Sequence, residues 1–219
     1  MNIFVLDTNA LVAAEMHCDK HCVKMILEYG QLLSTAHRLL DGTPKTLKYT
    51  KNTITPVQKQ KKIWELHGET STMVSQYDPV LLQEVWKLHV QNSKCYTASH
   101  MQHPGAVWAR NTMGNYRWLF TLFNACLAEY THRYGKVHAA TRIHAFLSGA
   151  PKNIPEGELT PFPLSMPPQY KVDDVVQSYQ NYYVGDKIRF AKWTNRPVPN
   201  WFAARLPENI NVADFSRTR

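Results

Sequence analysis

The residues best suited to chemistry lie between Asp19 and Leu40, a segment that we expect to be helical. Their spacing of three or four residues places them within an arc of about 100° on one helix. A solvated helix face would account for such a stripe equally well. If the stripe instead faces a pocket, Lys24 is suited to be a nucleophile or an electrostatic element, and Glu28 or His21 can transfer protons. The stripe contains His21, Lys24, Glu28, Gln31, Thr35 and Arg38.

A metal site is the second possibility at the start of this helix. His17, Cys18, His21 and Cys22 occur close together, and the two histidines share a helix face. The general-base glutamate of zinc-protease helices is absent from between them, and no C-x-x-C pair occurs. Zinc normally takes three or four ligands. We therefore expect packed or surface side chains here, with no metal and no cofactor.

Two further groups of residues could bind a substrate. Arg110 and Asn115 lie among aromatic residues in the middle of the chain, and a basic stretch near the C-terminus contains interleaved aromatic residues. Cations hold phosphates, and aromatic rings can stack on unpaired bases. The alternative is an amphipathic helix and an aromatic anchor that pins the tail to the core. The C-terminal candidates are Lys187, Arg189, Lys192 and Trp193.

The elements that must position these residues are mostly helical. We expect a mainly α fold, a single helical domain over residues 1–219 with a short N-terminal β-strand or small β-ribbon. The strand is expected at residues 1–6, a basic loop or arm at about 43–77, and an irregular tail at about 194–219. N-cap residues and proline place the helix starts. Helices are expected at 10–16, 19–40, from Pro79 onward, from Pro104 toward Gly135, at 137–147 and at 174–193, with proline-rich irregular structure at 151–168.

Composition limits the function classes. The 219 residues are 44% hydrophobic and 19% charged, which excludes wholesale disorder. The formal charge of +8 favours a polyanionic partner, DNA or a nucleotide. No P-loop, dinucleotide-binding or nucleophile-elbow motif occurs. We expect no membrane association, because no apolar run is long enough. Four cysteines and no secretory signal indicate reduced thiols in a cytoplasm.

Three segments together resemble a family of proteins encoded by tailed phages, including those of cyanobacteria. They are residues 1–7 with 17–25, residues 103–136, and residues 160–193. The resemblance covers most of the chain, but the stretch from about 43 to 101 is longer than the family's usual connection. The resemblance implies that the protein is located in the cytoplasm of a host cell.

Some members of that family are distantly similar to pyrimidine-dimer DNA glycosylases, which are small helical enzymes. The resemblance implies an amine nucleophile at the sugar C1′ and a glutamate on an early helix, the position of Glu28. Those enzymes use the α-amine exposed when the initiator methionine is removed. Here Asn2 normally leaves Met1 in place, so the nucleophile would be the Met1 amine or Lys24.

Three functions follow as hypotheses. The first is a phage DNA-processing enzyme, of DNA glycosylase or lyase type, that acts on a pyrimidine base or its N-glycosidic bond. Lys24, Glu28 and His21 would be catalytic, His21, Gln31, Arg110 and Asn115 would orient the base and sugar, and the C-terminal cations with Trp193 would hold the backbone or stack on a nucleotide. The second is a transferase that modifies a phage pyrimidine base. The third is a non-enzymatic module that binds nucleic acid or a host factor.

Overall fold

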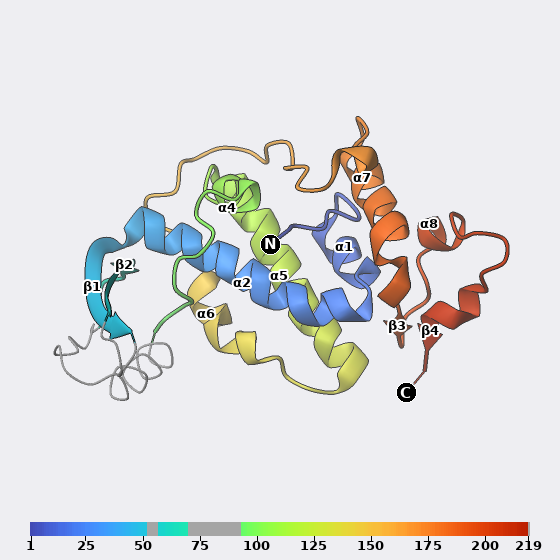
Figure 1. Ribbon diagram of the computed structural model, residues 1–219, viewed down its shortest axis with the longest axis horizontal. Helices are drawn as coiled ribbons and strands as arrows, with labels where there is room; N and C mark the ends of the chain where they lie inside the picture. The colour runs from blue at the N-terminus through green and yellow to red at the C-terminus, as the bar shows by residue number, and fades with distance from the viewer. Residues whose placement is uncertain (52–56, 70–92, 219) are drawn as a thin grey trace.

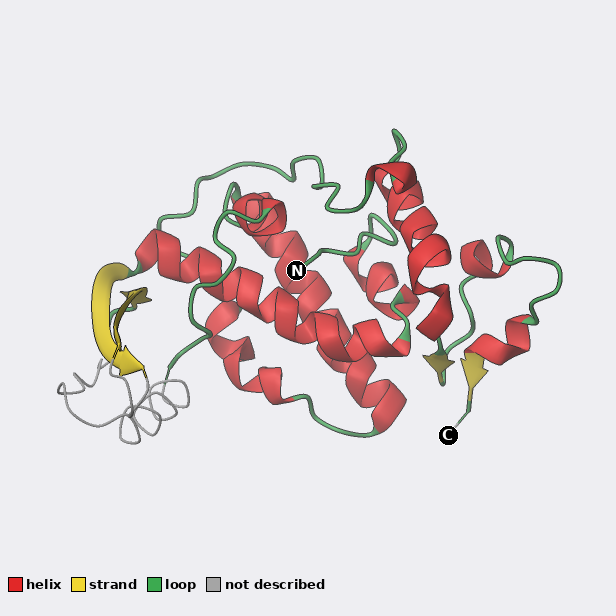
Figure 2. Cartoon of the chain, viewed as in Figure 1, coloured by secondary structure: helices red, strands yellow, loops and turns green. Residues whose placement is uncertain are grey.

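The computed structural model describes residues 1–51, 57–69 and 93–218. Within these ranges the chain is mainly helical and carries a small two-stranded antiparallel ribbon, as the sequence predicts (Figures 1 and 2). The longer elements are α1 (Ala10–Met16), α2 (Asp19–Asp41), β1 (Thr43–Lys51), β2 (Val57–Glu65), α4 (Pro104–Ala109), α5 (Met113–Tyr134), α6 (His144–Leu147) and α7 (Val175–Tyr182).

Helices α2 and α5 cross at the centre of the molecule, and α1, α4 and α6 pack around them (Figure 1). Their shared core is apolar because both helices repeat large hydrophobic residues at helical spacing. Leu32 and Leu33 of α2, and Leu119 and Phe123 of α5, are fully buried. Burying each such side chain contributes roughly 1.5–3 kcal/mol. The central pair therefore forms the rigid frame on which other segments are placed.

Local side-chain chemistry sets several helix ends. Asn9 caps α1 by accepting a hydrogen bond from the Leu11 N–H at 2.9 Å, and Asp174 caps α7 through the Gln177 N–H at 2.7 Å. Gly135 ends α5 with φ of 63°, a left-handed conformation that favours glycine. Asp19 differs, because Cys18 is the N-cap of α2 and the Asp19 carboxylate instead accepts from Arg133 at 3.0 Å.

The predicted strand at residues 1–6 is wrong: this segment is not paired in a sheet. Ile3 to Leu6 are buried among helices, and side chains satisfy backbone donors that a sheet would otherwise pair. The Asn2 N–H donates to Glu28 Oε2 at 3.1 Å, and the Phe4 N–H donates to the Tyr29 hydroxyl at 3.3 Å. The apolar composition indicated burial correctly but not the type of element.

The ribbon instead lies where the sequence indicated a basic loop or arm. Strands β1 and β2 pair antiparallel from Thr43 opposite Glu65 to Lys51 opposite Val57, beside the C-terminal end of α2 (Figure 1). Residues 52–56 and 70–77 of the expected arm, and the helix expected from Pro79, lie outside the described residues.

The C-terminal region has more structure than the expected irregular tail. After α7, a π-helical turn (Tyr183–Lys187) and a 3₁₀ turn (Ile188–Phe190) lead to the short strand β3 (Trp193–Thr194). β3 pairs in parallel with β4 (Ser216–Arg217), and α8 (Asn200–Ala203) lies between them in sequence. The predicted helix through Trp193 therefore ends early as an α-helix, at Tyr182. Buried Phe202 and Phe215 fasten this tail to the core.

Candidate active site

Glu28 is a mostly buried carboxylate at the edge of the exposed face of α2. Its side chain is 11% exposed, whereas neighbouring Lys24 is 67% exposed. Lys24 Nζ lies 3.0 Å from Glu28 Oε1, one helical turn away. The other oxygen, Oε2, accepts from the Asn2 N–H and lies 3.8 Å from the Met1 α-amine nitrogen. Glu28 thus joins α2 to the N-terminal segment and faces two amines.

Asn2 fixes the N-terminal segment beside Glu28. Its side-chain Nδ2 donates to the Ser165 carbonyl at 2.8 Å, and its Oδ1 accepts from the Tyr179 hydroxyl at 3.0 Å and from the Ile3 N–H at 2.8 Å. These partners come from the proline-rich segment, from α7 and from the neighbouring residue. Because Asn2 is held from three directions, it fixes the adjacent Met1 nitrogen beside Glu28.

His103 belongs to the same neighbourhood. It is the N-cap of α4, where Nδ1 accepts from the Gly105 N–H at 3.1 Å. Partial burial lowers the pKa of His103, the charges of the N-terminal amine and His100 lower it further, and Glu28 opposes them. The imidazole therefore favours its neutral form.

The polar stripe of α2 is divided between the interior and the solvent. His21, Glu28, Thr35 and Arg38 are buried, Lys24 is exposed and Gln31 is half-buried. Neither the fully solvated face nor the continuous inward stripe is therefore correct. The stripe supplies one exposed cation and one buried carboxylate in contact, and its remaining buried members have other partners.

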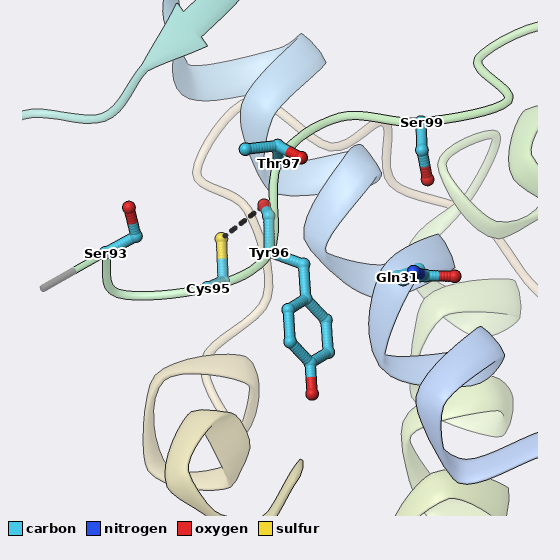
Figure 3. A pocket seen from close by; sticks show the side chains of 6 residues that line it. All are labelled: Gln31, Ser93, Cys95, Tyr96, Thr97 and Ser99. Carbon is cyan, nitrogen blue, oxygen red and sulfur yellow. Dashed lines mark hydrogen bonds between the residues drawn. The ribbon is translucent and has the colours of Figure 1, made fainter. Parts of the chain in front are cut away.

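Gln31 lines a small hollow between α2 and the segment 93–99 (Figure 3). The hollow has a volume of about 100 Å³, whereas small-molecule sites usually measure roughly 300–1,000 Å³. Its other lining residues are Ser93, Cys95, Tyr96, Thr97 and Ser99. This hollow is too small for a nucleotide, so the substrate-orienting role expected for Gln31 gains no support from it.

His21 points into an aromatic cluster instead of toward Glu28. Its Nδ1 bonds to the Tyr183 hydroxyl, and its ring centroid lies 4.3 Å from that of Phe4. Burial lowers the pKa of His21 to about 2, with further lowering by neighbouring positive groups. The neutral, enclosed ring is poorly placed for the proton transfer expected of it.

Arg110 and Asn115 differ in whether their polar atoms have hydrogen-bond partners. Both ends of the Asn115 amide are occupied: Nδ2 donates to the Trp108 carbonyl at 2.9 Å and to Thr160 Oγ1 at 2.8 Å, and Oδ1 accepts from the Thr160 N–H at 2.8 Å. Asn115 therefore ties the proline-rich segment to α5. Arg110 differs, because its buried Nη1 has no hydrogen-bond partner among the described residues. Burial also lowers the pKa of Arg110.

The C-terminal candidates comprise one exposed cation, Arg189, two partly buried lysines and a structural aromatic residue. Lys187 donates to Asp186 at 2.6 Å and to the Tyr182 hydroxyl at 3.0 Å, Arg189 is exposed near the Phe190 ring, and Lys192 donates to the Asp214 carbonyl. Trp193 is fully buried, and its indole N–H donates to the Met16 carbonyl at 3.0 Å. A ring without an exposed face cannot stack on a base, so the aromatic-anchor alternative describes Trp193 correctly.

The histidines and cysteines at the start of α2 are committed to packing. His17 Nδ1 bonds to the Ala13 carbonyl at 2.6 Å and Nε2 to the Tyr29 hydroxyl at 2.7 Å. Burial raises the pKa of Cys18 to about 11 and that of Cys22 to about 12. Across the described ranges, no group of three or more potential ligands is placed to hold a metal.

From the sequence, Met1 was expected only as an alternative nucleophile that Asn2 leaves in place, and neither the hydrogen bonds of Asn2 nor the position of His103 was foreseen. Each reaches Glu28's surroundings through contacts between distant parts of the chain. Ser165 also lies there: its carbonyl binds Asn2, while its buried hydroxyl has no partner among the described residues. The His-Pro pair at 103–104 was the available signal, since it marks a helix start whose cap is an imidazole.

Comparisons with known proteins leave the site to be judged from its own geometry. No family model, curated protein or solved structure matches this chain. Among the helices within the described ranges, none is both long and apolar enough to span a bilayer. The resemblance to phage proteins therefore rests on the sequence motifs alone.

Proposed function

We propose that this protein is a phage-encoded DNA-processing enzyme of glycosylase or lyase type, which acts on a pyrimidine base or its N-glycosidic bond. The observation that carries the proposal is the 3.8 Å approach of the Met1 amine to a buried carboxylate, Glu28. Both groups are held by the same residue, Asn2. A fixed amine beside a proton acceptor is the arrangement that amine-based covalent catalysis needs.

The Met1 amine is the better nucleophile of the two that contact Glu28. Lys24 is 67% exposed and lacks the desolvated surroundings in which lysines become nucleophiles. Two roles were expected for Lys24, nucleophile or electrostatic element, and we therefore assign it the electrostatic one.

In the proposed reaction, Glu28 takes a proton from the Met1 ammonium. The neutral amine forms a bond to C1′ of an extruded nucleotide, and the electron pair of the C1′–base bond leaves with the pyrimidine, which takes a proton from water. The secondary ammonium at C1′ then loses one proton to the hydroxide so formed, and its lone pair makes the C1′=N bond of an iminium as the C1′–O4′ bond breaks. Glu28 then returns its proton to the ring oxygen. Water hydrolyses the iminium and restores the amine.

Two further features support a DNA substrate. The chain has a formal charge of +8, and the unpaired, buried Nη1 of Arg110 has hydrogen-bonding capacity for a phosphate. The four free, buried cysteines are consistent with the proposed location in the host-cell cytoplasm.

A borohydride trap with ultraviolet-irradiated duplex DNA tests the proposal. We expect a covalent adduct with the wild type, retention of that adduct in Lys24→Ala, and its loss in Glu28→Gln or after an uncleaved Gly-Ser extension before Met1. Intact mass first establishes that Met1 is the terminal residue, and peptide mapping should place the adduct on it. Glu158→Gln, an exposed carboxylate variant, is the matched control. Absence of a wild-type adduct, or equal trapping after the extension, would exclude the mechanism.

A non-enzymatic DNA-binding module is the second candidate, and the exposure of Lys24 is the observation that favours it. In that case Glu28→Gln leaves binding unchanged and no adduct forms under any condition. Mass spectrometry of phage nucleosides with and without the gene separately tests base modification by group transfer.

A further inference from the structure

The positive charge of this chain is concentrated in the ribbon. Residues 43–65 contain six lysines and a single acidic residue, Glu65, which gives that segment a net charge of +5. The whole chain carries +8. A tenth of the sequence therefore accounts for more than half of the net charge. The lysines are Lys45, Lys48, Lys51, Lys59, Lys61 and Lys62.

The antiparallel register distributes these lysines over both strands and along the ladder. Tyr49 lies opposite Lys59, and Leu47 lies opposite Lys61. Nine paired residues at about 3.3 Å each give the ribbon a length of roughly 30 Å. The major groove of B-DNA, about 12 Å wide, admits a two-stranded ribbon. The ribbon thus has the charge and the dimensions to follow the phosphates of a duplex.

A buried ion pair holds the root of the ribbon against α2. Arg38 donates to both carboxylate oxygens of Glu69, at 2.8 and 2.9 Å, and to the Trp64 carbonyl at 2.6 Å. The Arg38 and Glu69 side chains are 2% and 4% exposed. Because Trp64 lies in β2 and Arg38 lies in α2, this contact fixes the end of the ribbon relative to the helix that carries Glu28.

The geometry of α2 gives the separation between the ribbon and the candidate active site. Asp41, the last residue of α2, follows Glu28 by thirteen residues, which corresponds to about 20 Å at 1.5 Å per residue. Successive base pairs of B-DNA rise about 3.4 Å. A duplex that runs along α2 from Glu28 would therefore meet the root of the ribbon about six base pairs from the target nucleotide.

We propose that the β1–β2 ribbon is a second DNA-contacting surface, which grips the phosphate backbone of a duplex about six or more base pairs from the target nucleotide. The proposal rests on the proposed function in taking DNA as the partner. The ribbon supplies affinity and orientation without sequence selectivity, because its cations meet phosphates.

The test measures the salt dependence of duplex binding in the Glu28→Gln background, which keeps the substrate intact. The ribbon variant combines Lys48→Gln, Lys59→Gln and Lys61→Gln. It spares Lys45, which pairs with Glu65, and Lys62, whose ammonium lies 5.4 Å from the Trp64 ring. The control removes three exposed cations from elsewhere, with Arg117→Gln, Lys136→Gln and Lys171→Gln.

We expect the ribbon variant to lower the slope of log K against log salt by roughly 0.9 for each phosphate that is no longer neutralised, about 2 to 3 in total. The control variant should change the slope by less than about 1. The difference between the variants should disappear on duplexes that extend only about three base pairs beyond the target on each side, since such duplexes are too short to reach the ribbon. Denaturation curves for both variants establish that folding is unchanged.

Equal slopes for the two variants on long duplexes would overturn the proposal. It would also be overturned if the ribbon variant lost as much binding to polyglutamate as to duplex at the same salt, because the ribbon would then bind any polyanion. The borohydride trap is a separate measurement. An intact slope effect without an adduct would remove the lyase mechanism and leave the ribbon as a binding surface. An adduct with equal slopes would remove the ribbon's role and leave the mechanism.

Discussion

Glu69 and Glu28 each bind a cation on α2, but they differ in how fully their oxygens are hydrogen-bonded, which we call saturation. Glu69 receives both donors of the Arg38 fork and the N–H groups of Leu66 and Lys94, at 2.8 to 3.1 Å. Glu28 instead faces the exposed Lys24, an amine at 3.8 Å and one backbone N–H. The fully bonded group fixes the structure, whereas the loosely bonded group retains partners that can move or react.

The electrostatics of Glu69 agree with this distinction. Burial alone would raise the pKa of Glu69, but the Arg38 guanidinium and the backbone N–H groups hold it below its usual range. Glu69 therefore stays charged and bonded under ordinary conditions. A proton-transfer group must exchange protons, so saturation of this kind suits an anchor and not a catalyst.

The largest expected effect comes from breaking the saturated pair. Arg38→Met should destabilise the fold by about 3–5 kcal/mol, because it leaves the Glu69 carboxylate buried without its main partner. Urea denaturation measures this change. The double variant Arg38→Met with Glu69→Leu should recover much of the stability, since neither charge then remains. A cost below about 1 kcal/mol for Arg38→Met would contradict the structural role.

Asn115 was expected to orient substrate, but its amide is fully hydrogen-bonded. The variant Asn115→Ala tests whether its role is structural instead. Asn115→Ala removes the partners of the Trp108 carbonyl and the Thr160 N–H, and each unsatisfied buried group costs about 1–3 kcal/mol. We expect a decrease of about 2–3 kcal/mol in the free energy of unfolding and unchanged adduct formation per folded molecule. Abolished trapping in a fully folded variant would return Asn115 to the active site.

His17 is a second fully bonded group, because both of its ring nitrogens are hydrogen-bonded. Its effect on stability should therefore depend on pH. Burial lowers its pKa from about 6.5 to about 4. Above pH 6.5 neither the folded nor the unfolded chain protonates this ring. As the pH falls from 6.5 to 4, only the unfolded chain takes up the proton, so stability is lost. The loss from His17 reaches about 2 kcal/mol at pH 5.

Denaturation at pH 7 and pH 5 isolates this contribution. The difference in unfolding free energy between the two pH values should be about 2 kcal/mol smaller in His17→Gln than in the wild type. His132→Gln, at an exposed histidine on α5, is the matched control. An unchanged pH dependence in His17→Gln would mean that the buried ring accepts a proton without cost.

The parts of the fold that the sequence predicts are those set by short-range contacts. Asn9, Asp174 and Gly135 act on backbone groups within a few residues, so their roles can be read locally. The ribbon was missed as a pair of strands because lysine is uncommon in strands. Residues 1–6 were assigned to a strand because apolar composition indicates burial and cannot distinguish a sheet from a helical core.

The candidate site divides in the same way. Helical spacing was enough to place Lys24 beside Glu28, one turn apart. The approach of Met1 to Glu28 depends on Asn2, whose partners Ser165 and Tyr179 are more than 160 residues away in sequence. No local pattern indicates a contact over that separation. The full burial of Trp193 likewise follows from packing by the tail and not from its basic neighbours.

The smallest expected effect on stability lies at Lys24, the most exposed partner of the unsaturated carboxylate. Lys24→Ala should change the free energy of unfolding by no more than about 0.5 kcal/mol, because an exposed pair one helical turn apart gains little in water. The same variant tests its electrostatic role, since the rate of adduct formation should fall while the adduct still maps to Met1. Lys20→Ala, an exposed lysine on the same helix, should change neither quantity. A destabilisation above about 2 kcal/mol in Lys24→Ala would mean that this pair is structural, like Arg38 and Glu69, and would remove the contrast on which the assignment of Glu28 depends.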